Sequence, residues 1–164
     1  MEKLKIIGGN RLSGSISCSG AKNAALPMLA ATILSDKSVT FKNLPYLQDI
    51  TTMFEILGSM GADITLNENM DFMISTANLH DFEARYELVK TMRASILVLG
   101  SLVARHGFAR IALPGGCAFG TRPVDFHLAA LEQLGAKIEL KNGYIEASAK
   151  KLIGCEITFP GISV

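Results

Sequence analysis

The sequence is poor in the residues that build metal centres and disulfide frameworks. It has three cysteines, Cys18, Cys117 and Cys155, which are widely spaced and include no Cys-x-x-Cys pair. It has three histidines, and their spacing is not that of metal ligands. An odd number of separated cysteines argues against a disulfide framework and against a zinc site. We therefore expect three free thiols, a reducing compartment and no bound metal.

The chain also lacks an excess of one charge sign and a long hydrophobic run. The 16 Lys and Arg residues stand against 15 Asp and Glu residues, which gives a formal net charge of +1. Such a chain has no general attraction for nucleic acid or a membrane surface, so any anion site must be local. The apolar runs are too short or too interrupted to span a bilayer, and none follows the first residues as a secretory signal would. We expect a cytoplasmic protein that binds neither nucleic acid nor membrane.

Hydrophobic residues make up 49% of the chain, enough for the core of one domain, and their spacing predicts the main elements. Two nearly all-apolar runs, 24–34 and 88–104, are predicted to be helices buried on every side. Helical spacing predicts amphipathic helices over 49–60 and 125–134, each ended by a glycine. Alternation predicts strands at 38–42 and 109–114, hairpins at 64–74 and 137–147, and two short strands within 4–18, where Cys18 packs.

These elements form two copies of one unit. Leu57 and Met60-Gly61-Ala62 align with Leu131 and Leu134-Gly135-Ala136 at one constant offset, and Lys22 aligns with Arg93. The units span about 20–76 and 91–148, and each has a buried helix, a strand, an amphipathic helix and a hairpin. Since the inner helices are apolar all round while the strands alternate, the helices belong inside and the sheets outside. The pattern therefore predicts an α/β fold.

A third copy begins near the end of the sequence. Leu152-Ile153-Gly154 repeats Leu12-Ser13-Gly14, and Gly161-Ile162-Ser163 stands where Gly20-Ala21-Lys22 precedes the first buried helix. Stacked repeats normally need about three copies to cover a core. We therefore expect the N-terminal part of a longer protein, with two complete units. Its unfinished core would expose apolar edges that could drive self-association.

A glycine-rich loop links the second unit's strand to its amphipathic helix. It reads Pro114-Gly115-Gly116-Cys117-Ala118-Phe119-Gly120-Thr121-Arg122-Pro123-Val124-Asp125. Its glycines let successive backbone N–H groups point at an anion, and Arg122 offers a planar fork of donors that suits phosphate or carboxylate. These features predict an anion site, although a Pro-Gly-Gly turn with a cysteine is also typical of a plain connector.

Three motifs carry a resemblance that covers essentially the whole chain. They are Gly20-Ala21-Lys22-Asn23-Ala24-Ala25-Leu26-Pro27, Val89-Lys90-Thr91-Met92-Arg93-Ala94-Ser95 and the cysteine loop. Together they resemble the UDP-N-acetylglucosamine 1-carboxyvinyltransferases, which are enolpyruvyl transferases. The resemblance implies an inside-out α/β barrel of βαβαββ units, incomplete here, with the family's second domain absent.

The resemblance also implies a reaction. The enolpyruvyl group of phosphoenolpyruvate moves to the 3-hydroxyl of UDP-N-acetylglucosamine by addition and elimination of phosphate, without metal or cofactor. This is the first committed step of peptidoglycan synthesis. Cys117 matches the family's general acid, which fosfomycin captures covalently; a thiol that is mostly protonated at neutral pH can donate a proton.

The resemblance assigns ligands to further residues. Lys22 and Arg122 match positions that bind phosphoenolpyruvate, Asn23 matches a sugar contact, and Arg93 matches a ligand-binding arginine. The nucleotide-sugar segment matches Arg122, Pro123, Val124, Asp125 and Phe126, and Ser163 and Val164 resemble the end of another UDP-binding segment. A helix start beside Lys22 would add its dipole to the attraction for phosphate.

Other interpretations of these residues stay open. Asn23 could be a helix N-cap, Arg93 could pair with Glu87 or Asp125, and Cys117 could be an unreactive loop thiol. The chain could be a non-catalytic nucleotide-sugar-binding fragment, or part of a 3-phosphoshikimate 1-carboxyvinyltransferase, which shares the fold. Because the family's other catalytic residues lie in the missing parts, we expect this chain alone to be inactive or nearly so.

Overall fold

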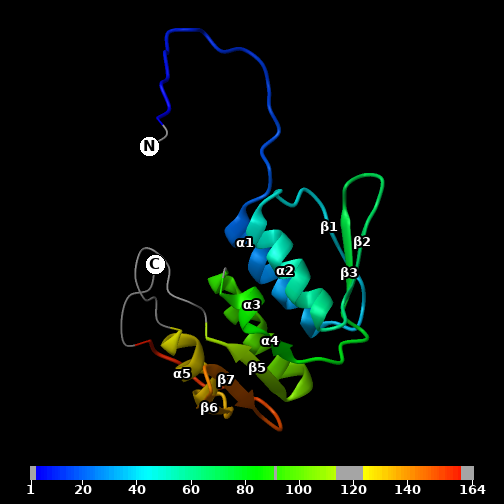
Figure 1. Cartoon of the computed structure of the whole chain (residues 1–164), viewed down its shortest axis with the longest axis vertical. Helices are drawn as coiled ribbons and strands as arrows, with labels where there is room; N and C mark the ends of the chain where they lie inside the picture. The colour runs from blue at the N-terminus through cyan, green and yellow to red at the C-terminus, as the bar shows by residue number, and fades with distance from the viewer. Residues whose placement is uncertain (1–2, 91, 114–123, 160–164) are drawn as a thin grey trace.

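The computed structural model describes residues 3–90, 92–113 and 124–159, in which the elements occur in two similar series (Figure 1). The first series is α1 (Lys22–Ala31) with its 3₁₀ extension η1 (Thr32–Leu34), β1 (Val39–Phe41), α2 (Gln48–Ser59), β2 (Asp63–Leu66) and β3 (Phe72–Ser75). The second is η2 (Arg93–Ile96), α4 (Leu97–His106), β5 (Phe108–Ala112), α5 (Asp125–Gln133), β6 (Lys137–Lys141) and β7 (Tyr144–Ser148). Between them lie β4 (Glu83–Ala84) and α3 (Tyr86–Val89).

The two series form sheets with the same strand order. β3 lies between β1 and β2 in one sheet, and β7 lies between β5 and β6 in the other, with antiparallel pairing in both. β4 adds a fourth strand, parallel to β5. Two residues are too few to show alternation, so the sequence gives no sign of β4.

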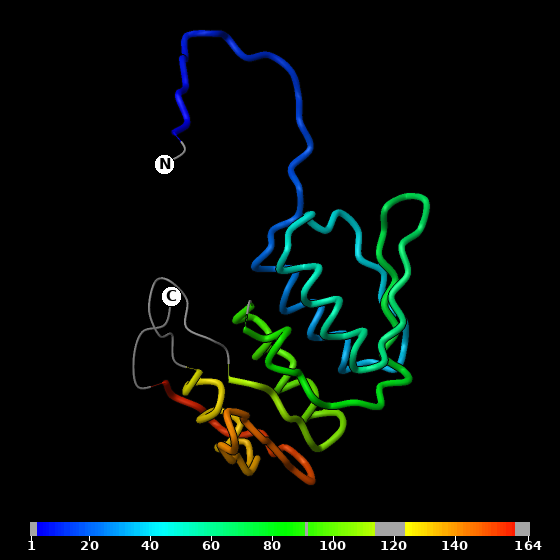
Figure 2. Tube along the Cα trace, viewed as in Figure 1, coloured from blue at the N-terminus to red at the C-terminus, as the bar shows by residue number. Residues whose placement is uncertain are grey.

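Helices α1, α2 and α4 lie between the two sheets (Figures 1 and 2). α4 packs on α1 and η1, and α1 packs on α2. The α/β fold with helices inside and sheets outside is confirmed. The expected burial of the first inner helix on every side is wrong, because Met28 of α1 is 50% exposed and Leu34 of η1 is 56% exposed. The described residues leave each of these two side chains about half exposed.

The predicted helix over 88–104 is not continuous. α3 ends at Val89, Met92 is extended with φ −138° and ψ 113°, and the helical path restarts at Arg93. Arg93 begins the second inner helix where Lys22 begins the first, so the residues before it belong to the connection between the units. The helix ends as expected at Gly107, whose φ of 75° is left-handed and costs glycine no steric strain.

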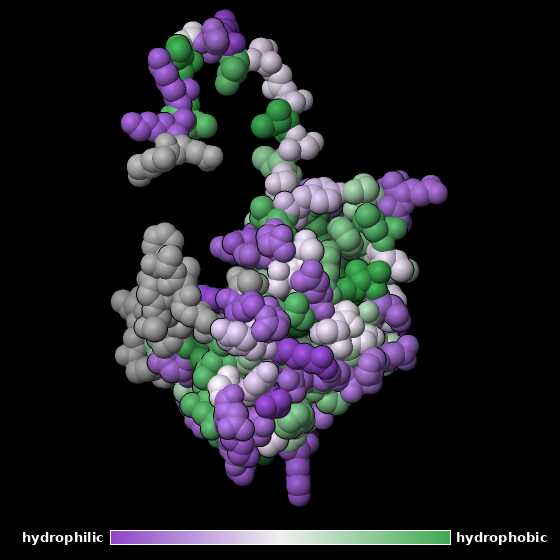
Figure 3. Space-filling view, viewed as in Figure 1, coloured by the Kyte–Doolittle hydropathy of each residue, from purple (hydrophilic) through white to green (hydrophobic). Residues whose placement is uncertain are grey.

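The two strands expected within residues 4–18 do not form. This segment stands clear of the body as an arm, with apolar side chains exposed along it (Figure 3). Leu12 and Ile16 are each 92% exposed, and Cys18 is exposed rather than packed in a sheet. Alternation produces a strand only where a sheet edge and an apolar partner are available, and the described residues offer this arm neither.

The outer face of the second sheet carries charged side chains, as the alternation of apolar and polar residues along its strands predicts. Arg110 on β5 donates to Glu83 on β4 at 2.6 Å and to Glu146 on β7 at 3.2 Å, and its guanidinium lies 3.8 Å from the centre of the Tyr144 ring. The hydrogen bond that Arg110 donates to Glu83 is the main cause that raises the pKa of Arg110. The Arg110 side chain thus links β4, β5 and β7 on the face of the sheet away from the helices.

Candidate functional site

Lys22 is the first residue of α1, and a close backbone contact sets its position. The Gly20 N–H donates to the Asn43 carbonyl at 3.1 Å, and Asn43 donates its amide to the Cys18 carbonyl at 3.2 Å. A Cβ at position 20 would lie 2.3 Å from the Asn43 oxygen, so only glycine fits. The segment that precedes α1 is thereby fixed against the connection between β1 and α2.

The Lys22 ammonium forms an ion pair that crosses between two helices. Its Nζ lies 2.7 Å from Oδ2 of Asp49, which is in the first turn of α2. The side chains are 42% and 32% exposed. Asp49 was not among the predicted site residues, and the sequence carries no signal for it, because the two residues are separated by a strand and two loops.

Asn23 lies beside Lys22 in the first turn of α1 and is exposed. The interpretation of Asn23 as an N-cap is wrong, since Ala21 holds that position and makes no side-chain bond. Pro27 lies in the second turn, because the helix begins earlier than the apolar run suggested. Having no N–H, Pro27 leaves the Asn23 carbonyl without its usual helical donor. Asn23 thus presents an amide and a carbonyl at the end of the helix that holds Lys22.

Arg93 begins η2 and is half-buried. It occupies the start of the second inner helix as Lys22 occupies the start of the first. Just before it, Lys90 pairs with Glu87 and lies 5.8 Å from the centre of the Tyr86 ring. The hydrogen bond that Lys90 donates to Glu87 is the main cause that raises the pKa of Lys90.

Val124, Asp125 and Phe126 form the start of α5. Val124 is the N-cap and makes no side-chain bond, and Asp125 is exposed in the first turn. Phe126 contacts the Phe159 ring, with centroids 5.3 Å apart. Both rings line an apolar hollow of about 400 Å³ with residues of η2 and α4, among them Ile96 and Leu97. The structure thus brings Phe126 close to the helical turn that Arg93 begins.

Five predicted site residues, Cys117, Arg122, Pro123, Ser163 and Val164, lie outside the described residues. The described residues on either side fix where the cysteine loop begins and ends. Leu113 donates its N–H to the Gly143 carbonyl at 2.8 Å, and α5 begins directly after Val124. The loop therefore spans the same connection, strand to amphipathic helix, that holds Asn43 in the first series.

The described part of the site offers a lysine, an asparagine and an arginine at the starts of inner helices, where exposed N–H groups and the helix dipole favour anions. Within residues 3–90, 92–113 and 124–159, no group of three or more His, Cys, Asp or Glu side chains is placed to hold a metal ion. None of the helices described there is both long and apolar enough to cross a membrane. The donors suit phosphorylated ligands.

Known proteins resemble this chain in sequence and in fold. A family model described as EPSP synthase (3-phosphoshikimate 1-carboxyvinyltransferase) matches residues 6–164. A UDP-N-acetylglucosamine 1-carboxyvinyltransferase of Halorhodospira halophila is 55% identical over 157 residues, which are 96% of this chain and 38% of that protein. The crystal structure of the enolpyruvyl transferase NikO from Streptomyces tendae has a TM-score of 0.75 at 26% identity, covering 92% of this chain and 33% of its own. An EPSP synthase of Acinetobacter baumannii shares the fold, with a TM-score of 0.69 at 17% identity over 92% of this chain and 35% of its own.

Proposed function

Because the chain belongs to the EPSP synthase family, we propose that it forms part of an enzyme that transfers the enolpyruvyl group from phosphoenolpyruvate to the 3-hydroxyl of UDP-N-acetylglucosamine. The chain spans about 38% of the curated relative that it matches, so the isolated chain is expected to have little or no turnover. The observation that carries the proposal is the placement of Lys22 and Asn23 in the first turn of α1, where no side chain caps the helix. An anion fits there.

In this proposal the residues divide between the two substrates. Lys22 and Arg122 neutralise phosphoenolpyruvate, Arg93 holds a further anionic group, and Asn23 contacts the sugar. The nucleotide-sugar segment runs from Arg122 through Pro123, Val124, Asp125 and Phe126, with Ser163 and Val164 as a second contact. Cys117 donates the proton to the methylene carbon. No cofactor takes part.

The proposal extends to the setting of the reaction. The product would enter peptidoglycan synthesis in the cytoplasm, and the rest of the barrel and a second domain would complete the site. The alternative acceptor is 3-phosphoshikimate, which the description of the matching family names. The loop with Cys117 and Arg122-Pro123-Val124-Asp125 and the 55% identical relative favour the UDP-sugar.

Fosfomycin provides the direct test of this site. The Cys117 thiolate would open the epoxide, forming a C–S bond while the ring C–O bond breaks and its oxygen takes up a proton. The chain alone, and a hybrid in which it replaces the matching 157 residues of the Halorhodospira halophila relative, are incubated with fosfomycin, with and without UDP-N-acetylglucosamine. Peptide mass spectrometry then locates the adduct. We expect it on Cys117 in the hybrid, promoted by the sugar nucleotide.

Cys18 and Cys155 are exposed and serve as internal controls, and Cys117→Ser should abolish the adduct. Labelling of all three thiols alike would indicate nonspecific alkylation. No adduct in the hybrid, with or without nucleotide, would contradict the proposal. Promotion by 3-phosphoshikimate in place of the UDP-sugar would favour the alternative acceptor.

A further inference from the structure

The Lys22–Asp49 ion pair occupies the place where the proposed function puts a ligand anion. The Asp49 carboxylate lies 2.7 Å from the Lys22 ammonium, at the N-terminal ends of α1 and α2 together. α1 has no acidic residue in its own first turn. Among the described residues, Asp49 is therefore the carboxylate that faces the cation of this helix end.

The pair is too exposed to be explained by stability. The Lys22 and Asp49 side chains are 42% and 32% exposed. Ion pairs this exposed contribute little to the free energy of folding, because solvent screens the two charges. The packing of α1 on α2 and the Gly20–Asn43 contact hold the two helix ends together without it. Little free energy is lost when such a pair separates, so the ammonium is available to a stronger anion.

The Asp49 carboxylate and a phosphate compete for the Lys22 ammonium, because both are negatively charged and repel each other. A phosphate bound to Lys22 would lie within a few ångströms of Asp49, and repulsion at that distance is substantial in the intermediate dielectric of a protein surface. A negative charge about 5 Å from a bound anion should weaken anion binding roughly tenfold. This estimate takes an effective dielectric constant between that of bulk water and that of a protein surface.

We propose that Asp49 is the resident counter-ion of Lys22: it positions the ammonium in the empty site and is displaced when a phosphorylated ligand binds. This inference rests on the proposed role of Lys22. It makes Asp49 a positioning residue that acts through Lys22, lowering the affinity for stray inorganic phosphate. A ligand with several contacts, such as phosphoenolpyruvate, overcomes the competition more readily.

The test measures anion binding at Lys22 in the 164-residue chain. Phosphoenolpyruvate and inorganic phosphate are titrated separately while NMR follows the Lys22 side-chain ammonium and the backbone amides of Lys22 and Asn23. Asp49→Asn keeps the size and an oxygen acceptor but removes the charge. We expect it to bind inorganic phosphate about tenfold more tightly than the wild type, and phosphoenolpyruvate more tightly by a smaller factor.

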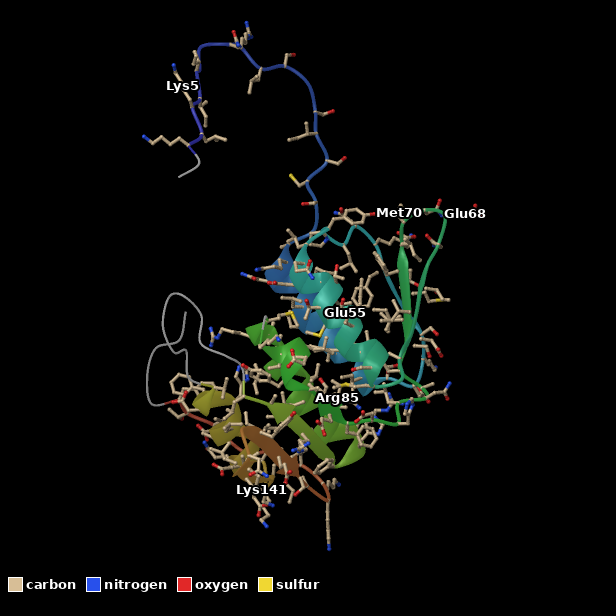
Figure 4. The ribbon with its side chains drawn as sticks, in the orientation of Figure 1. Lys5, Glu55, Glu68, Met70, Arg85 and Lys141 are labelled. Carbon is tan, nitrogen blue, oxygen red and sulfur yellow. The ribbon has the colours of Figure 1, made fainter. Side chains whose placement is uncertain are left out.

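Glu55→Gln is the matched control, because Glu55 is an exposed carboxylate on the same helix and its removal changes the net charge equally (Figure 4). It should leave both affinities unchanged. In Lys22→Met, the further change Asp49→Asn should have a clearly smaller effect, since the competition for the ammonium is gone and only direct repulsion between the carboxylate and the anion remains. A purely structural role for Asp49 would not produce this dependence on Lys22.

The outcomes separate the inference from the proposed function. Equal phosphate affinity in Asp49→Asn and wild type, with Lys22→Met still weakening binding, overturns the role of Asp49 alone. Binding that Lys22→Met leaves unchanged overturns the anion site at Lys22 as well. If Glu55→Gln tightens binding as much as Asp49→Asn, net charge explains the effect and the inference is wrong. No perturbation of Lys22 in either protein also overturns it, while the fosfomycin experiment reports independently on Cys117.

Discussion

At the scale of single residues, protonation of His106 makes the stability of the fold depend on pH. Its Nε2 is buried and has no hydrogen-bond partner among the described residues, and its ring stacks on Phe82 with centroids 4.5 Å apart. Burial, and to a lesser extent the positive charge of Arg105, lowers its pKa below the ordinary value of 6.5. The folded protein therefore prefers the neutral ring.

This shift predicts a loss of stability on acidification. As pH falls through 6.5 the unfolded chain takes up a proton before the folded chain does, so the free energy of unfolding declines until the lower folded pKa is reached. Above pH 6.5 the neutral His106 ring makes its full contribution to the free energy of unfolding. His106→Phe keeps the stacking and removes the titration, so urea unfolding from pH 7.5 to 5 should show a flatter profile. His80→Phe removes an exposed histidine and serves as the control variant; equal slopes in the wild type and His106→Phe would contradict this.

At the scale of elements, Arg105 joins the two units. From the last turn of α4 its Nη1 lies within 3.1 Å of the Ile33, Ser35 and Thr76 carbonyls and of the Thr76 hydroxyl. These oxygens belong to the end of η1 and to the residue that follows β3. A cation at a helix C-terminus satisfies carbonyls that have no helical donor.

Replacing Arg105 by Met should therefore destabilise the fold. The methionine keeps much of the apolar stem but removes the Arg105 donor from the Ile33 and Thr76 carbonyls, at a cost of about 2 kcal/mol, while the Ser35 carbonyl still accepts from the Thr76 hydroxyl. Arg85→Met is the matched control, because Arg85 is 69% exposed and makes one ion pair of 3.4 Å with Asp81. Its loss should cost less than about 0.5 kcal/mol. Urea unfolding at pH 7.5 measures both, and similar losses would show that Arg105 does not join the units.

The sequence predicted the elements whose signal is local. Helix α2 and both hairpins follow from periodicity, and Gly107 marks the end of α4, because side-chain spacing and glycine conformation act over a few residues. The break before Arg93 and the unpaired arm were missed, since both depend on what the segment can pack against. The same limit applies to the site: Lys22 could be found from its motif, whereas Asp49 is near it only through the packing of two helices.

At the scale of the whole molecule, the two inner helices differ in which face is covered. Met28 aligns with Leu99 at the offset that aligns Lys22 with Arg93, yet Met28 is 50% exposed and Leu99 is 1% exposed. Conversely, Leu29 of α1 is fully buried, while its counterpart Gly100 lines the apolar hollow beside α5. Among the described residues, the face of α1 that carries Met28 is thus left exposed, while the equivalent face of α4 is buried. The exposed Met28 side chain lies beside Ala31, Val39 and Phe41, so this surface is apolar and its burial against a further unit would be favourable.

For the chain by itself, a second copy can supply that unit. The α1 face with Met28 and the apolar hollow lined by α4 and α5 are different surfaces, so a contact between them would be heterologous. Burial of apolar surface would drive this contact. We expect sedimentation velocity at increasing protein concentration to show reversible association. Met28→Glu should weaken it at least tenfold by placing a charge in the contact. Met73→Glu alters a methionine of similar exposure, 47%, on β3 and should leave it unchanged. A wild-type chain that stays monomeric, or equal effects of both substitutions, would contradict association through α1.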